Sequence, residues 1–181
     1  MKSGIRRINI WGGPGAGKST LAAYVFSILK QEGYSVEHIT EFIKQWTYIP
    51  ITPKSYDSVF CFINQIHNED IVLRGETKMI VSDSPIILQY FYNNYHNCPG
   101  QEGVLKIALE YEKIYPSLNI FLNRNDIHYN ELGRYEKLEE AKKIDLKIEN
   151  MLLDLNIPFK KFSCEEIDNI VKYIKENIEH C

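Results

Sequence analysis

The chain carries near its N-terminus the run Gly12, Gly13, Pro14, Gly15, Ala16, Gly17, Lys18, Ser19 and Thr20. The run matches the pattern G-x-x-x-x-G-K-[ST] of a phosphate-binding loop. A short β-type segment precedes it at residues 7–11, and a helix-type segment follows from residue 18. A glycine loop between a strand and a helix is the setting in which this pattern binds phosphate. The chain is therefore expected to bind a nucleoside triphosphate through these nine residues.

Each part of the loop has a separate expected task. Glycines allow backbone N–H groups to turn toward phosphate oxygens, and the start of the following helix adds a positive dipole end. Lys18 is expected to reach the β- and γ-phosphates, and the Ser19 hydroxyl is expected to ligate Mg²⁺. ATP and Mg²⁺ are therefore the predicted cofactors.

The composition indicates a single domain over residues 1–181, and the 181 residues suffice for a substantial core. The net charge of −3 and the pI near 6.0 argue against a broad nucleic-acid-binding surface. The four cysteines lack metal-binding spacing and are typical of reduced thiols: Cys61, Cys98, Cys164 and Cys181. The sequence shows neither a membrane-length apolar run nor room for a signal peptide before residue 7, so a cytoplasmic location without membrane association is expected.

Strand-type and helix-type segments alternate along the chain. The expected strands are 7–11, 35–40, 78–82, 118–123 and 159–162, and the expected helices are 18–32, 56–74, 85–95, 101–115, 135–155 and 165–179. This alternation predicts an α/β fold, a three-layer P-loop NTPase sandwich with a five-stranded parallel sheet. The polar segment 124–136 is expected to form a short lid.

Polar residues follow the expected strands at the edge where parallel sheets bind ligands. Glu41 follows the second strand, Asp83 the third, and Arg124 and Asp126 the fourth, while Arg134 lies at the start of a long helix. Asp83 is expected to hold Mg²⁺ together with Ser19. Either Glu41 or Asp83 serves as the base, with Glu41 preferred, and the two arginines are expected to clamp phosphate. Simpler readings are a helix cap for Asp83 and a surface carboxylate for Glu41.

Three classes of triphosphate-binding protein compete. A mechanical ATPase usually carries Glu after the metal-binding Asp, whereas Asp83 is followed by Ser84. A GTP-binding switch carries D-x-x-G after the third strand, and this chain does not. A small-molecule kinase accounts for more residues, because phosphoryl transfer needs a donor loop, a proton acceptor and phosphate-clamping arginines. The sequence therefore favours a kinase.

The chain resembles the NadR-like AAA domain group of P-loop kinases and, more distantly, the deoxynucleoside kinases. The resemblance covers residues 7–155 and rests on the phosphate loop, Glu41, the Ser82–Pro85 motif and the 126–134 segment. It implies that Glu41 receives the proton of the acceptor hydroxyl and that Gln65 reads the acceptor base. Asp126 belongs to the same motifs and is expected to contact the substrate.

The acceptor stays open at this level. Ser84 stands where deoxynucleoside kinases carry Arg, and kinases of this layout differ in acceptor because fold does not fix substrate. A nucleoside, a nucleoside monophosphate and nicotinamide riboside are each compatible. The alternatives are a kinase of a hydroxymethylated base in DNA, which is the one expected role of nucleic acid, and a P-loop NTPase or GTP-binding switch without an acceptor. ATP against GTP preference and the oligomeric state also stay open.

Overall fold

A five-stranded parallel sheet forms the middle layer of the protein. The structure is a computed structural model that describes residues 4–48, 53–124 and 137–178. The strands are β1 (Arg7–Trp11), β2 (Val36–Ile39), β3 (Met79–Ser82), β4 (Ser117–Asn123) and β5 (Lys160–Ser163). Their order is β2-β3-β1-β4-β5, and every pair is parallel. β1, the strand that leads into the phosphate loop, is therefore central.

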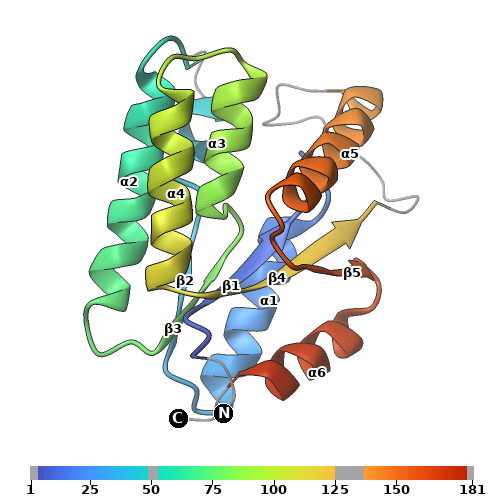
Figure 1. The fold of residues 1–181 in the computed structure, drawn as a ribbon. Helices are drawn as coiled ribbons and strands as arrows, with labels where there is room; N and C mark the ends of the chain where they lie inside the picture. The colour runs from blue at the N-terminus through green and yellow to red at the C-terminus, as the bar shows by residue number, and fades with distance from the viewer. Residues whose placement is uncertain (1–3, 49–52, 125–136, 179–181) are drawn as a thin grey trace.

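Helices cover both faces of this sheet (Figure 1). Helices α1 (Lys18–Gln31) and α6 (Ile167–Asn177) pack on one face. Four helices pack on the other: α2 (Asp57–Leu73), α3 (Ile86–Tyr95), α4 (Gln101–Ile114) and α5 (Leu138–Asp154). The predicted three-layer α/β sandwich is confirmed.

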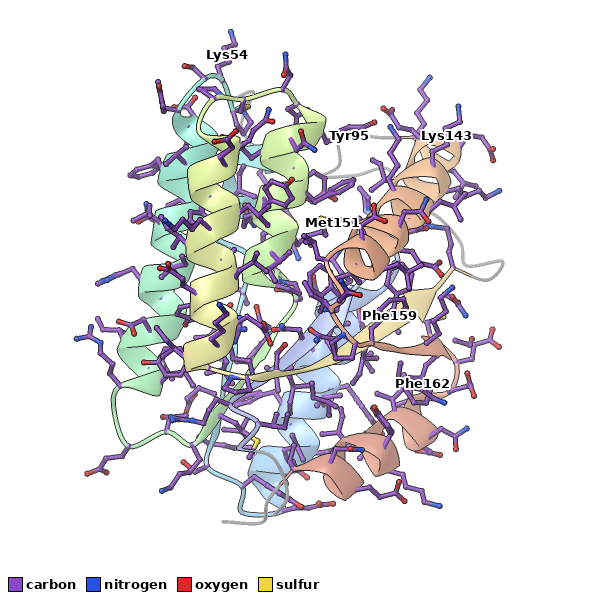
Figure 2. The ribbon with its side chains drawn as sticks, viewed as in Figure 1. Lys54, Tyr95, Lys143, Met151, Phe159 and Phe162 are labelled. Atoms are coloured by element: carbon purple, nitrogen blue, oxygen red, sulfur yellow. The ribbon has the colours of Figure 1, made fainter. Side chains whose placement is uncertain are left out.

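The alternation of side chains along the central strands divides the core into two halves. Ile8 and Ile10 of β1 point into the half beneath α1 and α6, whereas Trp11 joins the half beneath α2–α5. The second half extends between α3 and α5, where Tyr95 and Met151 lie on facing sides of the two helices (Figure 2). The Tyr95 hydroxyl donates to Glu140 Oε1 at 3.0 Å. Tyr95, the last residue of α3, thus joins this helix to α5.

The observed elements follow the expected ones closely, with one addition. A 3₁₀ helix, η1 (Phe42–Tyr48), connects β2 toward α2 and was not expected. Seven residues are too few to show a helical period, and 3₁₀ segments have no strong sequence pattern of their own. Most of the expected lid, residues 125–136, lies outside the described residues. Within the described ranges, no helix has both the length and the hydrophobicity that a membrane crossing requires.

A buried ion cluster lies at the amino end of β1, away from the phosphate loop. Arg7 is 1% exposed and pairs with Glu112, and its Nη1 lies 3.6 Å from Glu69 Oε2. Its guanidinium also lies 4.8 Å from the ring centre of Tyr111. Burial raises the pKa of Glu69 to about 7, although the charge of Arg7 opposes this shift. Arg7 thus pairs with two carboxylates, and its charge only partly offsets the cost of burying the charge of Glu69.

Candidate functional site

The phosphate loop leaves the carboxyl end of β1 and leads directly into α1. Gly17 is the N-cap of α1 and has φ +89°, a left-handed conformation that glycine adopts without strain. Helix α1 begins at Lys18, so its N-terminal N–H groups face the loop, as anion binding requires. The Lys18 ammonium donates to the Gly13 carbonyl at 2.9 Å. The loop therefore has the strand, turn and helix that the sequence predicts.

A carboxylate and a guanidinium contact the loop from β4 and α5. Asp145 of α5 accepts a hydrogen bond from the Gly13 N–H at 2.5 Å and one from Arg124 Nε at 2.8 Å. Arg124 Nη2 also donates to the Pro14 carbonyl at 2.5 Å. The Arg124 side chain is 5% exposed. The expected role of Arg124 as a phosphate clamp stays a prediction, and in this structure its contacts include Asp145 of α5 and the Pro14 carbonyl of the loop.

The two carboxylate residues expected at the site are neighbours through a backbone hydrogen bond. Strands β2 and β3 are paired with Ile39 opposite Ser82, so the residues just after each strand lie at the same edge. Asp83 is 2% exposed, and its Oδ1 accepts from the Glu41 N–H at 3.1 Å. The pairing brings Glu41 and Asp83 together, as the sequence predicts.

Lys44 of η1 links this edge to α1. Its ammonium donates to Ser19 Oγ at 3.2 Å, so a cation touches the hydroxyl that is expected to ligate Mg²⁺. His38 lies in the same region: burial lowers its pKa, the charge of Asp83 opposes the shift, and that of Lys44 adds to it. The Ser19, Asp83 and Lys44 side chains thus belong to one charged neighbourhood.

The donor set at this edge fits Mg²⁺. Magnesium prefers oxygen ligands and is commonly bound by one or two protein side chains together with substrate phosphates and water. Ser19 and Asp83 supply such oxygens. Over residues 4–48, 53–124 and 137–178, no group of three or more His, Cys, Asp and Glu side chains could hold a metal by itself. A magnesium ion at this edge is expected to take its other oxygen ligands from phosphate and water.

Gln65 of α2 is fully buried beside the start of η1. Its Oε1 accepts from the Phe42 N–H at 3.0 Å, and its side chain also acts on the Glu69 carboxylate. Base reading by Gln65 stays a prediction. The hydrogen bond with the Phe42 N–H gives Gln65 a second candidate role, which is to hold the backbone beside Glu41.

Phe42 directly follows Glu41 and packs with two aromatic side chains from further along the chain. Phe42 and Phe60 are in edge-to-face contact with 5.8 Å between ring centres, and Trp46 stacks near Phe60 at 6.5 Å. Phe60 is 53% exposed despite its size. We call Phe42, Trp46 and Phe60 the aromatic cluster. It offers ring surface to solvent close to the predicted base.

Two predicted site residues, Asp126 and Arg134, lie outside the described residues. Two others that contact the site, Lys44 and Asp145, were not predicted. Lys44 belongs to the unexpected 3₁₀ segment. Asp145 directly follows Ile144 of the buried α5 stripe, and an acidic residue beside such a stripe is ordinarily a solvated one.

These features define the class of protein: a P-loop nucleotide-binding domain, with a phosphate loop after the central strand and an acid after the adjacent one. A family model described as an AAA domain matches residues 7–166. The chain therefore belongs to this AAA domain family, which confirms the broader part of the resemblance, whereas the NadR-like kinase group stays a prediction. No curated protein was found to match the chain.

Proposed function

We propose that the protein is a kinase that transfers the γ-phosphoryl group of ATP to a nucleoside-like acceptor, as in the NadR-like group. The observation that carries this proposal is the hydrogen bond from the Glu41 N–H to Asp83. This bond holds Glu41 next to Asp83, the acidic residue that follows β3, at the sheet edge beside the phosphate loop. A nucleotide-binding site that only hydrolyses or senses ATP does not need a carboxylate for an acceptor hydroxyl.

The proposed reaction assigns one step to each group. The acceptor oxygen forms a bond to the γ-phosphorus while the bond to the β–γ bridging oxygen breaks, and ADP leaves. Glu41 takes the proton of the acceptor hydroxyl. Lys18 stabilises the charge on the phosphate oxygens, and Arg134 is expected to do the same for the transferred group. When bound, Mg²⁺ neutralises charge on the β- and γ-phosphates, and Ser19 and Asp83 are the side chains that would hold it.

The aromatic cluster supports an acceptor with a planar ring. Exposed large rings beside a site are favourable for stacking, and base stacking on an aromatic side chain is worth about 1–3 kcal/mol. Because Phe42 directly follows Glu41, a base stacked on this cluster would lie close to the proposed proton acceptor. Nucleosides, nucleoside monophosphates, nicotinamide riboside and hydroxymethylated bases all have such a ring.

An acceptor panel tests the proposal. The protein is incubated with Mg·ATP and each of these compounds, including an oligonucleotide that carries hydroxymethyl bases, and phosphorylated product and ADP are measured by mass spectrometry. We expect one compound to accept phosphate in a reaction that Lys18→Ala abolishes. ADP formed only with release of inorganic phosphate, for every compound, would show an ATPase or a switch instead.

A further inference from the structure

The carboxylate of Asp145 joins the phosphate loop to Arg124. One of its oxygens accepts from the Gly13 N–H and the other from Arg124 Nε, at 2.5 and 2.8 Å. The Asp145 and Arg124 side chains are 13% and 5% exposed. Hydrogen bonds in which the donor or the acceptor is ionised are shorter and about twice as strong as those between neutral groups. Asp145 therefore fixes the Gly13 N–H firmly.

The carbonyl of Gly13 contacts the loop lysine. This carbonyl accepts from the Lys18 ammonium at 2.9 Å and from the Ala16 N–H at 3.3 Å. The next carbonyl along, that of Pro14, accepts from Arg124 at 2.5 Å. Asp145 and Arg124 thus bind two consecutive residues of the loop, Gly13 and Pro14. Gly13 is also the residue that Lys18 contacts.

The packing around Gly13 matches this arrangement. A Cβ at this position would lie 2.6 Å from Asp145 Oδ1 and 3.1 Å from the Ala141 carbonyl, so a side chain would displace α5 from the loop. A carboxylate this close to a phosphate site would repel ATP if it were unpaired. Arg124 neutralises it, so the pair can hold the loop without a net negative charge.

We propose that Asp145 and Arg124 are positioning residues, which act together through Gly13 and Pro14 to hold the phosphate loop in the shape in which Lys18 meets the phosphates of ATP. The inference rests on nucleotide binding by the loop but not on the identity of an acceptor. It differs from the expectation that Arg124 clamps the transferred phosphoryl group, because in that case Arg124 would act on phosphate without Asp145.

A double-mutant cycle separates the two roles. Asp145→Ala and Arg124→Gln are made singly and together, and the dissociation constant of Mg·ATP is measured by calorimetry without an acceptor. We expect each single variant to weaken Mg·ATP binding by at least about tenfold, and the double variant to be no weaker than either single one. Arg124→Lys keeps the charge but loses the two-pronged contact, so it should fall between Arg124→Gln and the unsubstituted protein.

Glu149→Gln is the matched control. It removes a second ion pair of α5, the one with Lys161 of β5, which lies outside the phosphate loop. We expect Glu149→Gln to change the melting temperature but not the dissociation constant of Mg·ATP. This result would show that loss of an α5 ion pair does not by itself weaken Mg·ATP binding. If a variant at 124 or 145 does not fold, Arg124→Lys alone is compared with this control.

Two results would overturn the inference. The first is unchanged Mg·ATP binding in Asp145→Ala and Arg124→Lys. The second is a double variant whose loss equals the product of the single losses, which would mean that Arg124 acts on phosphate directly. Because binding is measured without an acceptor, a failure of the kinase proposal alone leaves this result intact. If the unsubstituted protein binds no Mg·ATP, both proposals are wrong.

Discussion

The Glu41 N–H donates to Asp83 Oδ1 over 3.1 Å, so the backbone of one acidic residue is held by the side chain of the other. Asp83 is 2% exposed and cannot turn away from the site without breaking this bond. The hydrogen bond therefore fixes the Asp83 side chain at the end of β3 and, with it, the backbone of Glu41. A fixed backbone at Glu41 suits the proton acceptor that we propose there.

Glu41→Gln tests the proton acceptor. The amide cannot accept the proton of an acceptor hydroxyl, so we expect phosphoryl transfer to fall by about 100-fold or more while Mg·ATP binding is unchanged. Transfer is measured with the compound found in the acceptor panel. Glu37→Gln on β2, which removes an exposed carboxylate paired with Lys30, serves as the control. A normal rate in Glu41→Gln would remove Glu41 from the mechanism.

Asp83→Asn tests the metal role. The amide oxygen can still accept from the Glu41 N–H, so the local backbone should keep its place, but the negative charge that attracts Mg²⁺ is lost. We expect ATP to bind about equally well without magnesium and the gain from adding magnesium to fall by about tenfold or more. Calorimetric titrations with and without Mg²⁺ measure this. An undiminished magnesium effect would place the metal on other groups.

The sequence allowed the sheet and the phosphate loop to be predicted because both depend on local patterns. The glycine run, the apolar runs of β3 and β4, and the stripe of α5 are each readable within a few residues. Strand pairing then made it predictable that Glu41 and Asp83 meet, since residues after adjacent parallel strands share one edge.

The contacts of Asp145 and Lys44 were not predictable in the same way. Asp145 lies 132 residues from its partner Gly13, and nothing in the α5 pattern distinguishes it from a solvated acid. Lys44 contacts Ser19 from a 3₁₀ segment that is too short to show a helical period in the sequence. Such contacts depend on how helices sit over the sheet, and local sequence does not determine that.

Gln65→Met tests whether Gln65 reads a base or holds the backbone beside Glu41. Methionine has similar length but only a weak thioether acceptor, so the part-buried Phe42 N–H loses its strong partner, and we expect a loss of about 1–3 kcal/mol in unfolding free energy. If Gln65 acts only through Phe42, KM should rise by a similar factor for acceptors with different bases. A change confined to some bases would favour base reading, and an unchanged KM for all of them would contradict both roles.

Gly13→Ala tests the close approach of α5 to the loop. The new Cβ would lie 2.6 Å from Asp145 Oδ1, so we expect a loss of about 1–3 kcal/mol in stability and weaker Mg·ATP binding. Gly103→Ala in α4 is the matched control, because nothing lies within 4 Å of its Cβ position. Alanine there should stabilise the helix by up to about 1 kcal/mol. Thermal unfolding and calorimetry measure both, and equal behaviour of the two variants would contradict the close packing.

Glu69→Gln tests the buried ion cluster through the pH dependence of stability. The pKa of Glu69 is raised to about 7 in the folded protein against an ordinary value of 4.5, chiefly by burial. Between pH 4.5 and 7 the folded protein therefore binds more protons than the unfolded chain, and stability falls as pH rises through this window. A pKa shift of this size corresponds to a fall in the unfolding free energy on the order of 3 kcal/mol across this pH window.

Glutamine stays neutral at every pH and leaves Arg7 paired with Glu112, so the variant should lack this decline. We expect the unfolding free energy of Glu69→Gln, minus that of the unsubstituted protein, to rise between pH 4.5 and 7 and to level off above it. Urea unfolding across this range measures it. Glu139→Gln, whose side chain is 78% exposed, should follow the unsubstituted curve. Parallel curves for Glu69→Gln would mean that Arg7 compensates Glu69 fully, because the carboxylate would then titrate alike in the folded and unfolded states.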